Sequence, residues 1–226
     1  MKIENIKSYG WVDAIRGMRN PLNSWDKIDS TFKFDPTDGS AIDVNLGPND
    51  LRLIKALTNG GSPHRKFLRQ ISVTMDITAP VYWWAEMDTY KVGTTRNSCS
   101  VQHKGSSRDF TVDDFTLDID DGITNLNNNE KLIAKDNLNI IITIMNTWRR
   151  KFMESNKENY NYFRIMRQLM PMGYNYKSTW TGNYETLINI YEWRYNHKLL
   201  EWHVFCDSII NNCPKFKELC VNSMPC

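Results

Sequence analysis

Four polar side chains near the C-terminal end of the sequence have types and spacings suited to a binding pocket. Arg194, His197 and Glu201 are spaced three and four residues apart, so on a continuous helix they would share one face. Asn183 precedes Arg194 by eleven residues, about three helical turns, and would join the same stripe. Such a stripe predicts one wall of a pocket. The residues also fit an alternative, in which Asn183 caps a helix and Arg194 forms a buried ion pair with Glu201.

A longer set of residues around this stripe has regular spacings. Pro171 follows Arg167 by four residues, and Asn183 follows the proline by twelve. Asn189 comes six residues later, and Arg194 five residues after that. In these residues the chain resembles the flavin-dependent thymidylate synthases, which carry Arg, Pro, Asn, Asn and Arg at the same intervals.

The resemblance implies an enzyme that methylates dUMP to dTMP with FAD as cofactor, and with NADPH and methylenetetrahydrofolate as co-substrates. In that family the two asparagines contact flavin, which assigns Asn183 and Asn189 to cofactor binding. The two arginines hold dUMP, which assigns Arg167 and Arg194 to the substrate, and Arg194 also to catalysis. A guanidinium suits this role because its planar fork donates several hydrogen bonds to phosphate and carbonyl oxygens at once. Glu201 matches a glutamate that follows the same helix in the family.

The segment of residues 62–73 extends the resemblance. It is similar to the family segment in which a histidine precedes an aromatic-rich strand and contacts the flavin ring, and this assigns His64 to cofactor binding. The alternative for a lone histidine beside a proline and an arginine is an ordinary surface position.

The family signature, Arg-His-Arg followed after seven residues by Ser, is altered in this chain. Ser100 aligns with the signature serine, which implies a role in substrate binding and catalysis. Tyr90, Lys91 and Val92 stand where Arg-His-Arg is expected, and a one-residue shift would put Lys91 at the last arginine. Gln102 replaces a further arginine. The resemblance assigns Lys91, Ser100 and Gln102 to the substrate.

The altered loop leaves two other functions open. A catalytically silent nucleotide- or flavin-binding protein on the same scaffold would keep Asn183, Asn189 and Arg194 while losing Arg-His-Arg. A related flavoenzyme would transfer another one-carbon unit to a pyrimidine nucleotide. Fold does not separate these functions, because chemistry depends on the residues of the site.

Composition narrows the class of protein. A net charge of +2 over 226 residues argues against a nucleic-acid binder that relies on overall charge. No apolar run reaches the roughly 18–20 residues that span a bilayer, so we expect a cytoplasmic protein without a membrane partner. The five cysteines lack the close pairs of zinc sites, so we expect free, mostly buried thiols, no metal site and no disulfide. Cys99 is expected to be buried too, with a nucleophilic role as the alternative.

Hydrophobic periodicity predicts early strands and late helices. Strands are expected over residues 2–9 and 71–79, and residues 19–48 and 94–107 are expected to be mostly loop. Residues 113–129 should form an exposed excursion. Helices are expected over residues 11–18, 51–57, 63–69, 81–90, 132–148, 157–169, 183–195 and 199–210.

This order predicts one α+β domain over residues 1–226, with a small antiparallel sheet and a helical C-terminal half. The resemblance implies a homotetramer with flavin sites at subunit interfaces. The long apolar helix and Trp83 and Trp84, which we expect to be exposed, would supply the contact surface.

Overall fold

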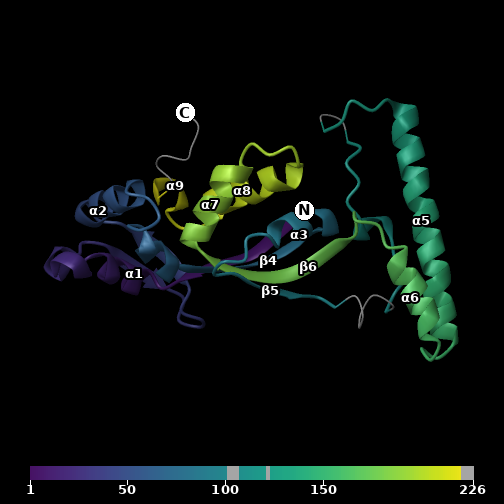
Figure 1. Cartoon of the computed structure of the whole chain (residues 1–226), viewed down its shortest axis with the longest axis horizontal. Helices are drawn as coiled ribbons and strands as arrows, with labels where there is room; N and C mark the ends of the chain where they lie inside the picture. Colours follow the sequence, from purple (N-terminus) through teal and green to yellow (C-terminus); the bar gives the residue numbers. More distant parts are fainter. Residues whose placement is uncertain (101–106, 121–122, 220–226) are drawn as a thin grey trace. The chain divides into compact units, whose positions relative to one another are not determined.

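The chain is represented by a computed structural model that describes residues 1–100, 107–120 and 123–219. Its α-helices are α1 (Trp11–Met18), α2 (Pro48–Asn59), α3 (Val81–Met87), α5 (Asn128–Glu154), α6 (Tyr160–Gln168), α7 (Tyr184–Arg194), α8 (Leu200–Asn212) and α9 (Phe216–Leu219) (Figure 1). Its strands are β1 (Lys2–Tyr9), β2 (Thr31–Phe34), β3 (Ala41–Asn45), β4 (Ser72–Pro80), β5 (Thr95–Ser98) and β6 (Asn175–Asn183). Four short 3₁₀ helices are η1 (Asn20–Leu22), η2 (Trp25–Lys27), η3 (Lys66–Gln70) and η4 (Val112–Asp114).

Backbone contacts divide the chain into two compact units. Unit 1 comprises residues 78–86 and 98–177 together with Met1. Unit 2 comprises residues 2–77, 87–97 and the described residues from 178 onward. The single domain expected over residues 1–226 stays a prediction. Among the described residues, no helix has the length and apolar character needed to cross a membrane.

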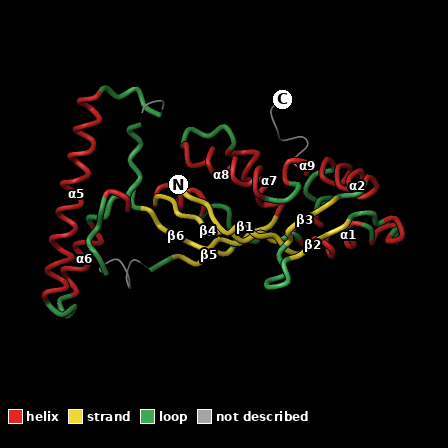
Figure 2. Tube along the Cα trace, turned by 180° about the vertical axis from the view of Figure 1, so that it is seen from behind, coloured by secondary structure: helices red, strands yellow, loops and turns green. Residues whose placement is uncertain are grey.

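The strands form a four-stranded sheet in the order β1-β4-β6-β5 and a two-stranded antiparallel sheet of β2 and β3 (Figure 2). In β4 the predicted alternation is confirmed, because Val73, Met75 and Ile77 are completely buried. The hydroxyl of Thr181 donates to Thr74 at 3.2 Å, and Thr179 donates to Asp76 at 2.7 Å. This reversed order of partners shows that β4 and β6 run antiparallel.

Strand β6 was not predicted, since residues 129 onward were expected to be helical. Its buried face is formed by Ser178, Trp180 and Gly182, and two of these three carry no apolar side chain. A Cβ atom at position 182 would lie 2.2 Å from the indole of Trp180, so glycine is needed where the ring crosses the backbone. A buried face built on serine and glycine gives no hydrophobic period of two.

The expectation of loop over residues 19–48 was also wrong, because it misses β2 and β3. These strands are short and mostly exposed, and Val44 is their buried residue, so they lack an alternating pattern. Before β2, a buried ion pair joins Arg19, the residue after α1, to Asp50 of α2. Asp50 accepts hydrogen bonds from Arg19 Nε at 2.8 Å and from Ser30 N and Oγ at 2.9 and 2.7 Å. Both oxygens of this carboxylate therefore meet donors, as a buried charge requires.

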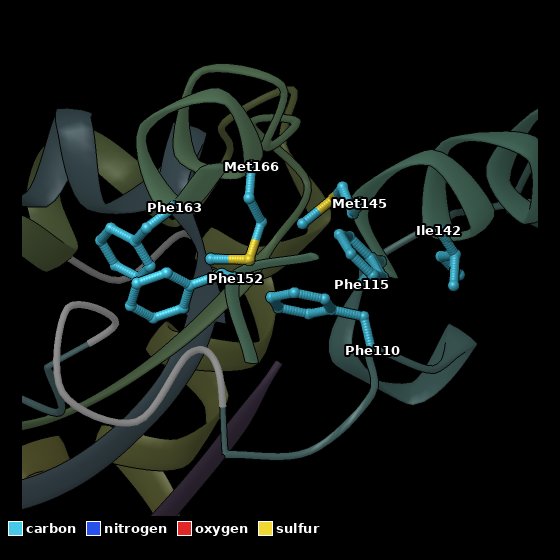
Figure 3. Packing of buried hydrophobic residues seen from close by; sticks show 7 residues of the cluster. All are labelled: Phe110, Phe115, Ile142, Met145, Phe152, Phe163 and Met166. Carbon is cyan, nitrogen blue, oxygen red and sulfur yellow. The ribbon is translucent and has the colours of Figure 1, made fainter. Parts of the chain in front are cut away.

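The core of unit 1 packs α5 against α6 and the segment before α5. Figure 3 shows the seven buried side chains of this cluster, which are Phe110, Phe115, Ile142, Met145, Phe152, Phe163 and Met166. The amide of Asn146 both donates to and accepts from the backbone of Phe110, at 2.9 and 2.8 Å. Because Phe115 and Ile119 are buried, residues 113–129 are not wholly the exposed excursion that we expected.

The side chains that we expected to be exposed for subunit contacts fall into two groups. Trp83 and Trp84 are 0% and 2% exposed, so that expectation was wrong. They lie on α3, where they pack against each other edge to face with ring centroids 5.0 Å apart. Helix α5 does expose Ile133, Ile140 and Ile144, which follow one another at intervals of seven and four residues and therefore share a face.

Candidate functional site

Helix α7 begins where β6 ends, and Asn183 joins the two elements. Its side chain accepts a hydrogen bond from Thr186 N at 3.0 Å, as the N-cap of α7. The part of the alternative interpretation that made Asn183 a helix cap is therefore confirmed. The amide nitrogen of Asn183 faces the opposite way, toward Gly93, where a Cβ atom would lie only 2.8 Å from it. Gly93 has a φ of +70°, which also favours glycine.

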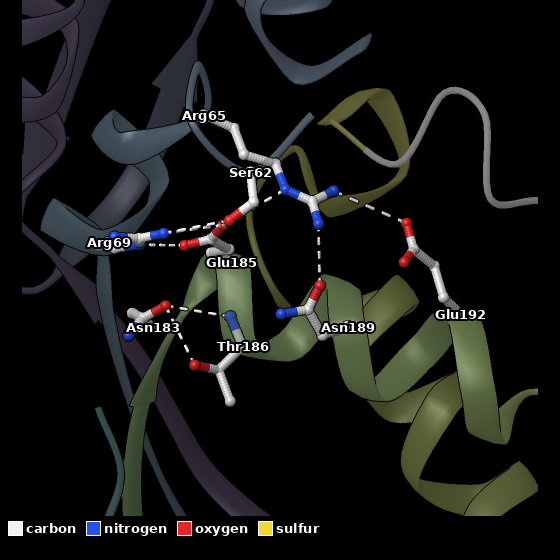
Figure 4. Close-up of polar contacts among 8 residues, drawn as sticks. All are labelled: Ser62, Arg65, Arg69, Asn183, Glu185, Thr186, Asn189 and Glu192. Carbon is white, nitrogen blue, oxygen red and sulfur yellow. Dashed lines mark hydrogen bonds and ion pairs between the residues drawn. The ribbon is translucent and has the colours of Figure 1, made fainter. Parts of the chain in front are cut away.

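A network of charged groups surrounds the first turns of α7 in unit 2 (Figure 4). Glu185 is buried and accepts hydrogen bonds from Ser62 Oγ at 2.7 Å, from Arg65 Nε at 3.4 Å and from Arg69. Arg65 also donates to Asn189 Oδ1 at 2.9 Å and lies 3.7 Å from Glu192. Burial alone would raise the pKa of Glu185, but hydrogen bonds from Arg69 and Ser62 and the charges of both arginines lower it.

The network borders a cavity of about 660 Å³ in unit 2. Its lining combines predicted site residues with others from the same unit: Ser62, Arg69, Thr89, Tyr90, Lys91, Val92, Gly93, Asn183, Glu185, Thr186 and Asn189. Three residues predicted from the sequence, Lys91, Asn183 and Asn189, thus lie around one cavity. We call it the α7 cavity.

Arg194 lies at the end of α7, next to this cavity. Its Nε donates to the hydroxyl of Tyr90 at 2.8 Å, and Tyr90 lines the cavity. The guanidinium carbon lies 5.6 Å from the ring centroid of Tyr90 and 4.8 Å from that of Trp202. Two aromatic rings thus hold the guanidinium, in an arrangement that favours its positive charge.

The stripe of Arg194, His197 and Glu201 does not exist on one helix. Helix α7 ends at Arg194, His197 lies in the connection, and Glu201 is in the first turn of α8. The spacing rule failed because it assumes a continuous helix. His197 nevertheless lies near Arg194 through a shared neighbour, since its ring packs edge to face on Trp202 with centroids 6.3 Å apart.

His64 lies at a different hollow of unit 2 from the two asparagines. It is exposed and lines a space of about 520 Å³ bounded also by Met18, Pro21, Leu57 and Phe67. The structure therefore does not bring His64 to the α7 cavity. Its assignment to flavin stays a prediction.

The remaining predicted residues belong to unit 1 or lie outside the described part of the chain. Ser100 lines a smaller hollow of about 190 Å³ together with Arg108 and Lys177. Arg167 is exposed in the last turn of α6 and donates to the hydroxyl of Tyr176, a lining residue of that hollow, at 2.8 Å. Gln102 lies outside the described residues.

The cysteines are free thiols where the structure describes them. Cys206 and Cys213 are buried, as expected, and burial raises the pKa of each thiol to about 12. Cys99 is exposed and lines the hollow of Ser100, so the expectation that it would be buried was wrong. Cys220 and Cys226 lie outside the described part. No cluster of three or more metal-ligating side chains occurs within the described ranges.

Sequence reasoning missed the charged side of the α7 cavity. Arg65 and Arg69 are four residues apart and both reach Glu185, and that spacing was available in the sequence. The sequence did not show that Glu185 is their partner, because it is more than a hundred residues away along the chain. Its pairing depends on the close approach of η3 and α7.

Comparisons with known proteins show which fold the chain has. No protein-family model and no curated protein matches the sequence. Among solved structures, the chain matches flavin-dependent thymidylate synthase ThyX from Helicobacter pylori, complexed with FAD and dUMP, over 98% of both chains. The identity is 16% and the TM-score 0.65, and a second structure of that enzyme with FAD and dUMP gives 14% and 0.64.

A third match is a UMP/dUMP methylase, PolB from Streptomyces cacaoi, bound with 5-Br UMP. It covers 98% of this chain and 94% of PolB, with 10% identity and a TM-score of 0.64. At these identities the likeness concerns the fold. Over nearly its whole length, this chain has the α+β fold of the ThyX flavin-dependent thymidylate synthases.

Proposed function

We propose that this chain is a flavin-dependent enzyme that methylates dUMP to dTMP, with NADPH and methylenetetrahydrofolate as co-substrates. The observation that carries the proposal is the placement of Asn183, Asn189 and Lys91 around one cavity. These residues were selected from the sequence by their resemblance to flavin- and nucleotide-contacting positions. Their convergence on a scaffold with the ThyX fold supports a working site.

The α7 cavity suits part of a flavin cofactor. Its volume of about 660 Å³ falls within the range of about 300–1,000 Å³ typical of small-molecule sites. Asn183 and Asn189 each use the side-chain oxygen inside the protein, so the amide nitrogens are available as donors to flavin oxygens or nitrogens. When bound, a reduced flavin supplies hydride to the pyrimidine. Asn183 and Asn189 would hold and orient it.

The nucleotide would be held by cationic groups. Arg194 is kept in place by Tyr90 and Trp202, which limits the conformational entropy lost when it contacts a phosphate or a carbonyl oxygen. Lys91 is exposed at the cavity and would supply a charge in place of the missing Arg-His-Arg. The resemblance also assigns Arg167, Ser100 and Gln102 to the nucleotide; the first two belong to unit 1, and Gln102 lies outside the described residues.

One observation favours the second candidate, a catalytically silent binding protein. Of the three residues at the position of Arg-His-Arg, Lys91 carries the single charge. The hydroxyl of Tyr90 is occupied by Arg194, and Val92 is 89% exposed and offers no polar side chain. Loss of these charges removes electrostatic stabilisation of a reacting nucleotide, while the amides of Asn183 and Asn189 remain for flavin.

The absorption spectrum of the purified protein with added FAD separates the two candidates. A bound flavin whose band changes on addition of dUMP supports a nucleotide placed beside the flavin. Under anaerobic conditions, the reduced flavin should then be reoxidised when dUMP and methylenetetrahydrofolate are added together. Binding of FAD without such reoxidation would favour the silent protein. Absence of flavin binding would refute the enzyme, and thermal stabilisation by dUMP alone would then favour a silent nucleotide-binding protein.

A further inference from the structure

The side-chain amide of Asn189 has a defined orientation, and Arg65 defines it. Arg65 Nη2 donates to Asn189 Oδ1 at 2.9 Å, and the arginine is itself held by Glu185 and Glu192 (Figure 4). A guanidinium only donates hydrogen bonds, so it selects the oxygen end of the amide. The nitrogen end is left directed away from Arg65. Within residues 1–100, 107–120 and 123–219, this Nδ2 has no acceptor.

Three other polar side chains at the α7 cavity have the same hydrogen-bonding character. Asn183 uses its oxygen for Thr186 N, so it also offers its amide nitrogen, and Lys91 and Arg69 are donors by nature. Glu185 is the acidic side chain of the lining, but its oxygens already accept from Ser62, Arg65 and Arg69. The amide nitrogens of Asn183 and Asn189 and the ammonium of Lys91 therefore present donors to a ligand, beside the hydroxyls of Thr89 and Tyr90, which can donate or accept.

We infer that Arg65 is a positioning residue that fixes Asn189 as a donor, and that the α7 cavity consequently selects a ligand group made of oxygen acceptors, with phosphate or pyrophosphate as its anionic class. The inference rests on the proposed function, because a nucleotide-type ligand carries such groups. Arg65 does not line the cavity itself. Its effect on the ligand passes through the amide of Asn189.

Replacing Asn189 by aspartate tests this orientation directly. In Asn189→Asp one carboxylate oxygen gains an ion pair with Arg65, while the other places an acceptor where the donor was. We expect FAD affinity to fall on the order of tenfold or more, below that of Asn189→Ala, while the melting temperature exceeds that of Asn189→Ala. The matched control is Asn211→Asp, at an exposed position near the end of α8 and outside the cavity lining, which should leave FAD affinity unchanged. Equal FAD affinity in Asn189→Asp and wild type would overturn the inference.

Substitutions of Arg65 separate positioning from a merely structural role. Without the guanidinium the amide is free to turn, so Arg65→Met should weaken FAD binding several-fold, and Arg65→Lys should restore most of it because an ammonium also only donates. Adding Arg65→Met to Asn189→Ala should cause no further loss of affinity, since no amide remains to be oriented. Arg52→Met, at an exposed position of α2, is the control. A lower melting temperature with unchanged FAD affinity in Arg65→Met would refute the positioning role.

A second probe keeps the inference independent of the flavin. If the wild type binds no FAD, the proposed function fails, and inorganic pyrophosphate is then titrated while thermal unfolding is followed. Stabilisation of the wild type and not of Asn189→Asp would support the donor-lined cavity. Failure of pyrophosphate to stabilise the wild type would overturn it.

Discussion

Replacing Arg194 by alanine should impair both nucleotide binding and stability, to different degrees. The guanidinium is half-buried, stacks near Trp202 and Tyr90 and donates to the Tyr90 hydroxyl. Two cation–π contacts of roughly 0.5–1 kcal/mol each and one hydrogen bond of about 1 kcal/mol suggest a loss of about 2 kcal/mol in unfolding free energy. If Arg194 also contacts dUMP, losing that charge-assisted contact should cost roughly 2–5 kcal/mol of affinity.

These two effects are measured separately. Calorimetric titration of folded protein with dUMP, at saturating FAD, gives the affinity, and urea unfolding gives the stability. A cost of 2 kcal/mol or more corresponds to a rise of roughly 30-fold or more in Kd. Arg194→Lys should also bind poorly, because an ammonium lacks the planar fork. Tyr90→Phe is the matched control for the hydrogen bond, with an expected loss of about 1 kcal/mol in stability. Unchanged dUMP affinity in a destabilised Arg194→Ala protein would refute the nucleotide-site assignment and leave Arg194 a structural role.

Three further predictions concern stability and assembly. Asp50→Ala leaves the buried charge of Arg19 without its partner, so it should lower the unfolding free energy by roughly 3–5 kcal/mol, whereas a loss below about 1 kcal/mol in urea unfolding would contradict the buried pair. Glu185 has a lowered pKa, so its stabilising effect is complete above about pH 4.3, its unfolded value, and is lost as pH falls through the folded value. The stability difference between wild type and Glu185→Gln, measured by urea unfolding, should therefore shrink on acidification, and a pH-independent difference would contradict this. The exposed face of α5 should pack in a homotetramer, so Ile140→Asp should reduce the mass seen by light scattering, and a monomeric wild type at micromolar concentration would contradict the prediction.

Elements with a continuous apolar pattern were predicted well from the sequence. Strand β4 alternates Val73, Met75 and Ile77 with polar residues, and α1, α2, α5 and α6 each carry an apolar helical face. Strand β6 escaped prediction because its buried face is carried partly by Ser178 and Gly182, which have no hydrophobic signal. Sequence periodicity detects a buried face only when apolar side chains form it, so it misses a buried face made partly of serine and glycine.

In the candidate site, too, features within a short stretch of sequence were predicted, and features that depend on contacts between distant residues were not. Asn183 and Asn189 were assigned through the resemblance to the family, whose residues at these positions lie close together along the chain. The orientation of Asn189 could not be predicted, because it depends on Arg65, which immediately precedes η3 and reaches α7 through tertiary packing. The presumed stripe of Arg194, His197 and Glu201 failed for a related reason, since sequence spacing does not reveal that α7 stops at Arg194.

Formation of dTMP is the direct test of the proposed methylation of dUMP. Purified protein is incubated with FAD, NADPH, methylenetetrahydrofolate and dUMP, and the nucleotides are separated by chromatography. We predict dTMP formation that requires FAD and falls strongly in Arg194→Ala. The control is Arg52→Met, which should form dTMP at the wild-type rate. Absence of dTMP from a protein that binds both FAD and dUMP would contradict the enzyme assignment and favour the silent binding protein.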